Sequence, residues 1–361
     1  MVGVRALLHW TYLIPPLALL TLVATWSAHP PNTVLAIVGV LLAAVVLAAV
    51  DHAEVVAHRV GEPFGALILA VAVTVIEVGL IVMLMVHGGS GDTSTLARDT
   101  VFAAAMITCN GIFGLSLLIA ALRQGTASFN AEGTATMLAT VATLATLTLV
   151  LPTFTTSAPG PEFSGEQLAF AGVCSIALYV VFVIVQTVRH RDSFVPEYDA
   201  PPAGHAEPRS DREVLISLAL LIVALIAVVG LAKVESPAIE DAVDSIHAPQ
   251  SAVGVIIALL VLLPEGLAAV RNARRDRVQI SFNLAFGSAI ASIGLTIPAI
   301  AVASIWLEGP LVLGLGPTQM VLLAITVVVG ALTVLPGRAT IQEAGVHLVL
   351  FAAFVFLAIR P

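Results

Sequence analysis

The chain has 361 residues, of which 59% are hydrophobic and 11% are charged, and its formal net charge is −8. A water-soluble domain carries about 25% charged residues, so this composition excludes an ordinary soluble fold and predicts an all-α polytopic membrane protein. The negative net charge gives no indication of a nucleic acid partner, and the partner that we expect is the lipid bilayer.

Eleven apolar runs are long enough to cross the membrane, because about 20 helical residues span ~30 Å of hydrocarbon. The predicted transmembrane helices are 7–26, 33–50, 64–86, 100–122, 134–151, 168–188, 213–232, 251–270, 280–305, 310–335 and 341–359. The first run resembles a signal peptide, but the pair Pro15-Pro16 interrupts it. We therefore interpret 1–32 as an extra N-terminal transmembrane helix.

The second predicted helix ends at a cluster of ionisable residues, Asp51, His52, Glu54, His58 and Glu62. Such a cluster could act as a proton antenna or as a regulatory cation site. A solvated interfacial loop is the simpler interpretation, and we prefer it.

The third and eighth predicted helices each carry one acid, Glu77 and Glu265, within a run that has no other ionisable residue. A carboxylate in hydrocarbon is costly unless it faces a cavity, a proton or a cation. A protonated structural acid, satisfied by a neighbouring helix, is the alternative for either residue alone. Because the feature occurs twice, it favours an ion transporter.

The helices that follow the two glutamate helices contain several small and polar residues. Asn110 lies on the fourth helix, Ser288 and Ser292 lie on the ninth, and Thr74 lies on the Glu77 face of the third. A buried amide needs partners, so Asn110 is the strongest single candidate for a ligand. For the serines, ordinary helix packing remains an alternative, and the Thr74 hydroxyl could bond back to its own helix.

A polar connection at 189–212 divides the predicted helices into six before it and five after it. Without the first helix, each half has five, at 33–188 and 213–361, and a glutamate lies on the second helix of each half. Since the third and eighth helices cross the membrane in opposite directions, the halves are predicted to form inverted repeats. The basic run Arg271–Arg277 is interpreted as a topology anchor that contacts lipid headgroups.

Basic residues orient the chain. If the N-terminus is cytoplasmic, that side holds 12 of the 15 Lys and Arg residues, all except Arg98, Lys233 and Arg360. The positive-inside rule therefore predicts a multi-pass protein of the inner membrane, with its N-terminus in the cytoplasm and its C-terminus outside. Acids of the predicted outer loops, among them Asp99 and Glu235, would form a mouth that attracts cations.

Two glutamates supply enough negative charge to neutralise one divalent cation or two protons. The pair can hold either cargo but not both, and the empty, doubly ionised pair is costly to carry through an apolar barrier. This mutual exclusion is the physical basis of antiport. The predicted metal ligands are Glu77 and Glu265, and the predicted cation- or proton-binding residues are Glu77, Glu265, Asn110, Ser292, Ser288 and Thr74. No cofactor is expected besides the transported ions.

The motifs GEPFG, VTVIEV, LLPEG and GSAIASIGLTIPA together resemble those of ChaA-type Ca²⁺/H⁺ antiporters of the cation/Ca²⁺ exchanger superfamily. The resemblance covers most of the chain and implies exchange of Ca²⁺, or in some members Na⁺ or K⁺, against protons by alternating access. It also implies that Glu77 and Glu265 are the essential membrane carboxylates and that Asn110 and Ser292 are polar site positions. Met106 stands where related exchangers often have a small polar residue, which favours proton coupling over Na⁺ coupling.

The predicted function is secondary antiport of Ca²⁺, with Na⁺ and K⁺ left open, against H⁺. The alternatives are a monovalent Na⁺(K⁺)/H⁺ antiporter, a passive cation channel and an intramembrane hydrolase. A hydrolase needs more than two carboxylates, and the predicted spans contain no HExxH motif, so we expect a transporter and not an enzyme. A channel tolerates the same residues but requires neither the inverted symmetry nor a site that is neutralised before it moves.

Overall fold

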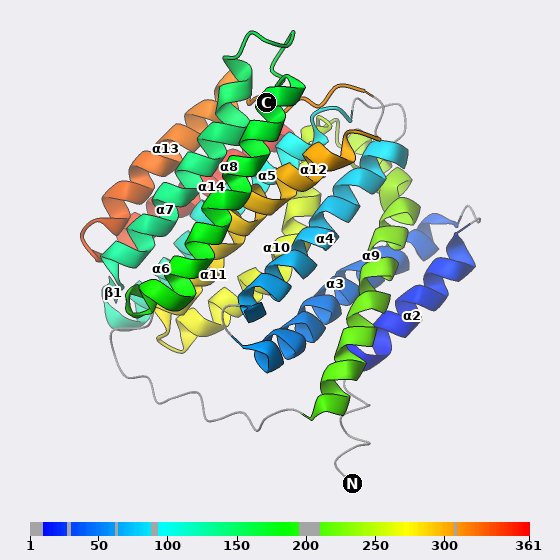
Figure 1. The fold of residues 1–361 in the computed structure, drawn as a ribbon, viewed down its shortest axis with the longest axis horizontal. Coiled ribbons are helices and arrows are strands. Elements are labelled where there is room, and N and C mark those ends of the chain that lie inside the picture. Colours follow the sequence, from blue (N-terminus) through cyan, green and yellow to red (C-terminus); the bar gives the residue numbers. More distant parts are fainter. Residues whose placement is uncertain (1–9, 27–29, 62–63, 88–92, 195–209, 307–308) are drawn as a thin grey trace. The chain divides into compact units, whose positions relative to one another are not determined.

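The computed structural model describes residues 10–26, 30–61, 64–87, 93–194, 210–306 and 309–361 (Figure 1). Of the predicted features, the start of the first helix, Glu62 and most of the 189–212 linker lie outside the described residues.

The described chain is almost entirely helical. Its α-helices are α2 Trp10–Thr25, α3 Asn32–Val60, α4 Phe64–His87, α5 Leu96–Met106, α6 Phe113–Gln124, α7 Ala131–Ala145, α8 Gly165–Ile184, α9 Asp211–Ser245, α10 Ser251–Arg274, α11 Val278–Ala291, α12 Ile297–Ala303, α13 Pro317–Val334 and α14 Ile341–Ile359. The π-helical segments are η1 Ile107–Ile112, η2 Thr146–Val150, η4 Val185–Arg189 and η6 Ser292–Thr296, and the 3₁₀ turns are η3 Leu151–Thr153 and η5 Arg191–Phe194. Two short strands, β1 Ala127–Ser128 and β2 Arg338–Ala339, pair antiparallel.

Ten continuous helical stretches in the described part are long and apolar enough to cross a membrane, and α2 is a shorter apolar helix. Each of the eleven predicted transmembrane helices therefore has a counterpart in the structure. This confirms the prediction of an all-α polytopic membrane protein.

The chain divides into two compact units. Unit 1 comprises Met1–Thr93 and His205–Val253, and unit 2 comprises Ser94–Gly204 and Gly254–Pro361. Each unit takes helices from both halves of the chain. The predicted repeats, 33–188 and 213–361, concern symmetry between the two halves and stay a prediction.

In unit 1, the long helix α9 packs against α2, α3 and α4. Two glycines allow close approach: a Cβ atom on Gly79 would lie 2.4 Å from Val229, and one on Gly230 would lie 2.4 Å from Leu22. Small residues of this kind let helices associate in lipid, where the hydrophobic effect gives no driving force between them.

Apolar side chains also cover outer faces of the helices. On α2, the side chains of Leu13, Leu17 and Leu20 recur at helical spacing and are exposed, and on α8 Phe170 and Val173 are exposed. Water would solvate such continuous apolar faces poorly, whereas lipid tails match them. The lipid bilayer therefore accounts for what would be an anomaly in a soluble protein.

The predicted helix 33–50 is longer than expected, because α3 continues to Val60. It ends where Gly61 takes a positive φ of 77° and its N–H bonds to Ala57 O at 2.9 Å. His52 is buried on this extension, with Nε2 2.9 Å from Thr11 O and its ring edge-on to Tyr12. The segment Asp51–His58 is therefore helical and not a loop, and His52 is buried in it, whereas Glu54 and His58 are exposed as the solvated interpretation expected.

One end of unit 2 is built around the β1–β2 pair, and we call it the ribbon end. Here Arg123 donates two hydrogen bonds to Asp276, at 3.1 and 3.2 Å, and this contact lowers the pKa of the Asp276 carboxyl. The Asn130 N–H donates to Gln279 Oε1 at 2.8 Å. The α6–α7, α10–α11 and α13–α14 connections thus meet at one end, as the predicted alternation of helices requires.

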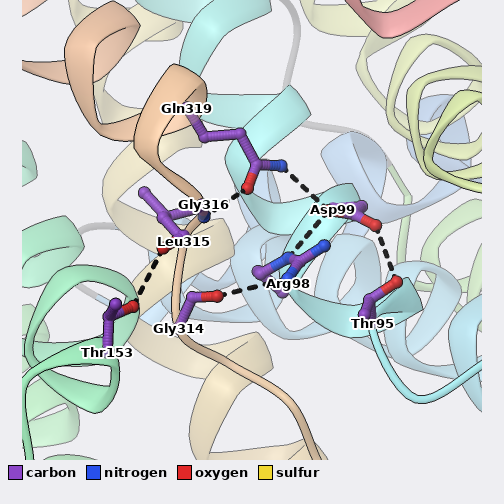
Figure 2. A network of polar contacts seen from close by, with 8 residues as sticks. All are labelled: Thr95, Arg98, Asp99, Thr153, Gly314, Leu315, Gly316 and Gln319. Atoms are coloured by element: carbon purple, nitrogen blue, oxygen red, sulfur yellow. Dashed lines mark hydrogen bonds and ion pairs between the residues drawn. The ribbon is translucent and has the colours of Figure 1, made fainter. Parts of the chain in front are cut away.

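The opposite end of unit 2 holds an extended segment, 309–316, where the sequence had predicted the start of helix 310–335 (Figure 2). Its N–H groups find acceptors outside a helix: Val312 bonds to Ser94 O, and Gly314 bonds to Pro161 O. Helix α13 begins only at Pro317, which suits the first turn because it has no N–H to satisfy.

Asp99 lies at this same end and is buried, not in an exposed outer loop as predicted. Its carboxylate accepts hydrogen bonds from Arg98 Nε at 2.8 Å, Thr95 Oγ1 at 2.9 Å and Gln319 Nε2 at 3.0 Å (Figure 2). Arg98 also donates to Gly314 O at 3.2 Å. Asp99 therefore ties α5 to the start of α13 and does not contribute to an acidic mouth.

Candidate functional site

Glu77 and Thr74 lie on α4 of unit 1, one helical turn apart on one face. The Glu77 side chain is 3% exposed, and Thr74 is also buried. An acid buried in the middle of a membrane-length apolar helix needs a proton, a cation or polar partners. The structure thus shows Glu77 buried on an apolar helix, and its role as an ion ligand stays a prediction.

Glu265 lies on α10 and belongs to unit 2. Pro264 precedes it within the helix and cannot donate the backbone hydrogen bond to Leu260 O, so that carbonyl is available to another donor or a cation. The next residue, Gly266, faces η1, because a Cβ atom there would lie 3.6 Å from Ile112. Glu265 is therefore adjacent in sequence to the contact between α10 and η1.

Asn110 and Ser292 both lie in π-helical turns. Asn110 is within η1, where the Phe113 N–H bonds to Thr108 O and Asn110 O instead of the regular acceptor Cys109 O. Ser292 begins η6, which is followed by Pro298, a residue without an N–H to close a regular α-turn. Single π turns inside α-helices occur frequently at functional sites, since they redirect side chains and carbonyls.

Within unit 2, the helix that leads into each π turn contacts the other π turn. Helix α11, which leads into η6, packs against η1, and helix α5, which leads into η1, packs against η6. Unit 2 therefore contains four of the predicted site residues, one on each of four elements: Asn110 on η1, Glu265 on α10, Ser288 on α11 and Ser292 on η6. Ser292 is buried and Ser288 is half-buried. Glu77 and Thr74 belong to unit 1, so the pairing of the two carboxyls stays a prediction.

A buried histidine, which sequence reasoning missed, contacts Asn110. His347 lies on α14, and its Nδ1 is 3.0 Å from Asn110 Oδ1. A signal for it exists in the sequence, because His347 is the only ionisable residue between Ala344 and Ile359. An isolated ionisable residue within a membrane span indicates a functional or a polar-paired position.

Glu235 is a second acid that the sequence misplaced. It was predicted in an outer loop, but α9 continues through it to Ser245 and leaves its side chain 6% exposed. Oε2 would lie 3.6 Å from a Cβ atom on Gly39 of α3, so the side chain points at that helix. The helix continues because only Pro237 opposes it, and membrane helices tolerate an internal proline.

Within the described residues, no group of three or more His, Cys, Asp and Glu side chains is arranged to hold a metal ion. Glutamate, amide, hydroxyl and backbone oxygens are the ligands that hard cations such as Ca²⁺ accept, and unit 2 supplies each of these types.

A family model described as "Sodium/calcium exchanger protein" matches residues 32–188 and 216–360. Over 98% of its length the chain is 45% identical to the putative ionic transporter y4hA of Sinorhizobium fredii, 96% of which is covered. Over 96% of its length it is 35% identical to the sodium-potassium/proton antiporter ChaA of Escherichia coli, 95% of which is covered. The solved structure of native YfkE matches 97% of this chain and 100% of its own, with a TM-score of 0.73 at 15% identity, which shows a shared fold.

Proposed function

Since the chain belongs to the sodium/calcium exchanger family, whose members are transporters, we propose that this multi-pass membrane protein exchanges Ca²⁺ for H⁺ by alternating access. Glu77 and Glu265 bind the cation or protons in competition. Asn110, Ser292, Ser288 and Thr74 supply neutral oxygen ligands.

The observation that carries this proposal is the pair of π turns. Each glutamate helix is followed in sequence by a helix that opens into a π turn at the polar residue predicted to contribute to the site, Asn110 in η1 and Ser292 in η6. Two such openings at corresponding places support an internal repeat whose halves each contribute one acid and one neutral ligand.

Electrostatics explains why the movement of the cation is coupled to the movement of protons. A divalent cation between two carboxylates is neutralised, and so is the pair when each carboxyl carries a proton. The empty, doubly ionised pair is strongly disfavoured in an apolar barrier, so the protein changes its open side only when the site is filled. Because only the filled site changes its open side, competition between Ca²⁺ and protons for this site results in exchange of one for the other.

The relatives make Na⁺ and K⁺ the second candidate cargoes. The 35% identical ChaA is named a sodium-potassium/proton antiporter, whereas YfkE is named a Ca²⁺/H⁺ antiporter in a second solved structure. Met106, beside Asn110, supplies no oxygen ligand where related exchangers often have a small polar residue, and in our proposal this favours proton coupling over Na⁺ coupling.

Everted membrane vesicles with an imposed pH gradient test the proposal. We expect Ca²⁺ to dissipate the gradient with the wild-type protein, and Na⁺ or K⁺ to do so less effectively. Glu77→Gln and Glu265→Gln should each abolish the response, since glutamine keeps the size of the side chain but carries no charge and does not bind or release a proton in this pH range.

The matched control is Glu166→Gln, which changes an exposed carboxyl on α8 and should leave exchange intact. Exchange that survives Glu77→Gln or Glu265→Gln would show that the site assignment is wrong. Ca²⁺ flux without proton movement would identify a channel instead of an antiporter.

A further inference from the structure

A cluster of four polar side chains lies buried in unit 2: Asn110 on η1, Thr326 and Thr333 on α13, and His347 on α14. Each of them is between 0 and 3% exposed. A polar group in the apolar interior of a membrane protein is costly unless it is hydrogen-bonded, so the arrangement of these four groups is strongly constrained.

The hydrogen bonds form one continuous chain. Asn110 Nδ2 donates to Thr326 Oγ1 at 2.9 Å, and the Thr326 hydroxyl in turn donates to Met106 Sδ at 3.6 Å. On the other side of the amide, His347 Nδ1 lies 3.0 Å from Asn110 Oδ1, and His347 Nε2 lies 3.2 Å from Thr333 Oγ1.

The chemistry of the acceptor assigns the proton. An amide oxygen can only accept, so His347 Nδ1 carries the hydrogen in this contact, and Nε2 of the neutral ring accepts from the Thr333 hydroxyl. The Asn110 amide is thereby held from both ends. With the proton on Nδ1, turning the amide over would place its NH₂ group against the His347 N–H and would lose that hydrogen bond.

Backbone packing brings His347 to this position. A Cβ atom on Gly114 would lie 2.9 Å from His347 Cβ, and one on Gly111 would lie 3.3 Å from the Phe351 ring. The Phe113 ring also meets the imidazole edge-on, with 4.9 Å between centroids. Helix α14 therefore lies tightly against the segment that begins in the π turn of Asn110.

The Asn110 oxygen has two lone pairs, and His347 takes one of them. We propose that His347 is a positioning residue for the cation site, which holds the Asn110 amide so that its oxygen presents the second lone pair to the transported cation. This inference rests on the proposed function, in which Asn110 is a cation ligand. Without the Nδ1–H bond the amide can rotate and present N–H groups, which repel a cation.

Two substitutions of His347 separate this role from simple packing. In His347→Asn the side-chain NH₂ takes roughly the place of Nδ1, and in His347→Gln it takes roughly the place of Nε2. We expect His347→Asn to keep the wild-type KM for Ca²⁺ in the vesicle assay. We expect His347→Gln to raise it roughly three- to tenfold, the effect of losing one hydrogen bond.

Two threonines serve as companion variants. Thr333→Val removes the partner of Nε2 but leaves the Nδ1–H bond to Asn110 possible, so it should raise the KM less than His347→Gln does. Thr326→Val releases the other end of the Asn110 amide and should raise the KM as His347→Gln does. Thermal unfolding in detergent verifies that each variant is folded, and rates are normalised to folded protein.

A double-mutant cycle with Asn110→Ala completes the test. His347→Gln should have no further effect on the KM in the Asn110→Ala background. If Asn110→Ala raises the KM but His347→Asn and His347→Gln behave alike, the positioning role is overturned while the proposed function stands. If Asn110→Ala leaves the KM unchanged, Asn110 is not a cation ligand, and both that assignment and the role of His347 are overturned.

Discussion

At the scale of single residues, two ion pairs of this protein show how burial changes the contribution of an ion pair to stability. The Arg98–Asp99 pair has side chains 15% and 3% exposed, whereas the Arg59–Asp211 pair, at 2.6 Å, has side chains 51% and 85% exposed. Water screens the exposed pair, which therefore contributes little to stability. Removing one partner of the buried pair leaves a charge without compensation in an apolar setting.

We therefore expect Asp99→Asn to destabilise the protein by about 3 kcal/mol, because Arg98 loses its counter-charge and the side chain loses an acceptor. Asp211→Asn, the matched change in the exposed pair, should cost less than about 1 kcal/mol. Chemical unfolding in detergent micelles measures both. Equal losses of stability would show that the Asp99 network is not the anchor of α13 that Figure 2 indicates.

An ionisable group that interrupts a long apolar run marked some of the buried residues, although His347, which interrupts α14 in this way, was missed. Glu77 is one of the residues marked in this way, and it is buried on α4 as expected. Sequence reasoning failed where a helix continues beyond its apolar part. Glu235 and His52 were assigned to polar loops but lie buried on α9 and α3. Burial on an extended helix depends on which neighbours that helix meets, and a single apolar run does not reveal this.

At the scale of helices and turns, the sequence indicated where the helices are but not how they are interrupted. Asn110-Gly111 and Pro298 disfavour a regular α-helix, yet the choice of a π turn depends on packing against α11, α5 and α14. The extended segment before α13 was likewise missed, because its hydrogen-bond acceptors, Ser94 and Pro161, are distant in sequence.

The contact between α6 and α14 gives a prediction at this scale. In Gly114→Ala, the added Cβ atom would lie 2.9 Å from His347 Cβ and 3.3 Å from the Leu348 nitrogen, so α14 must move. We expect a lower melting temperature, corresponding to about 1–3 kcal/mol of overpacking, together with a higher KM for Ca²⁺.

Gly345→Ala is the control, since it lies on the same helix α14 and a Cβ atom there meets nothing within 4 Å. It should leave exchange unchanged and stabilise the helix by up to about 1 kcal/mol. If both alanine variants behave alike, tight packing at Gly114 does not position α14.

At the scale of the whole molecule, the parity of the helices determines which loops share a side of the membrane. Within unit 2 the structure agrees with that parity, because the connections predicted to be cytoplasmic meet at the ribbon end. We propose that the ribbon end faces the cytoplasm, on the evidence of the positive-inside bias.

Cysteine labelling tests this orientation. In a background without Cys109 and Cys174, Ser128→Cys places a thiol at the ribbon end and Thr156→Cys places one at the opposite end, both at exposed positions. A membrane-impermeant maleimide should label Thr156→Cys in intact cells and Ser128→Cys only in everted vesicles. The reverse pattern would contradict the proposed orientation.

The central claim is that cation and protons compete for Glu77 and Glu265, and proton release on Ca²⁺ binding tests it most directly. In purified protein in weakly buffered detergent solution at mildly acidic pH, adding Ca²⁺ should release protons from the wild type, and the Glu77→Gln/Glu265→Gln double variant should release none. Ca²⁺ binding to the wild type without proton release would contradict the account.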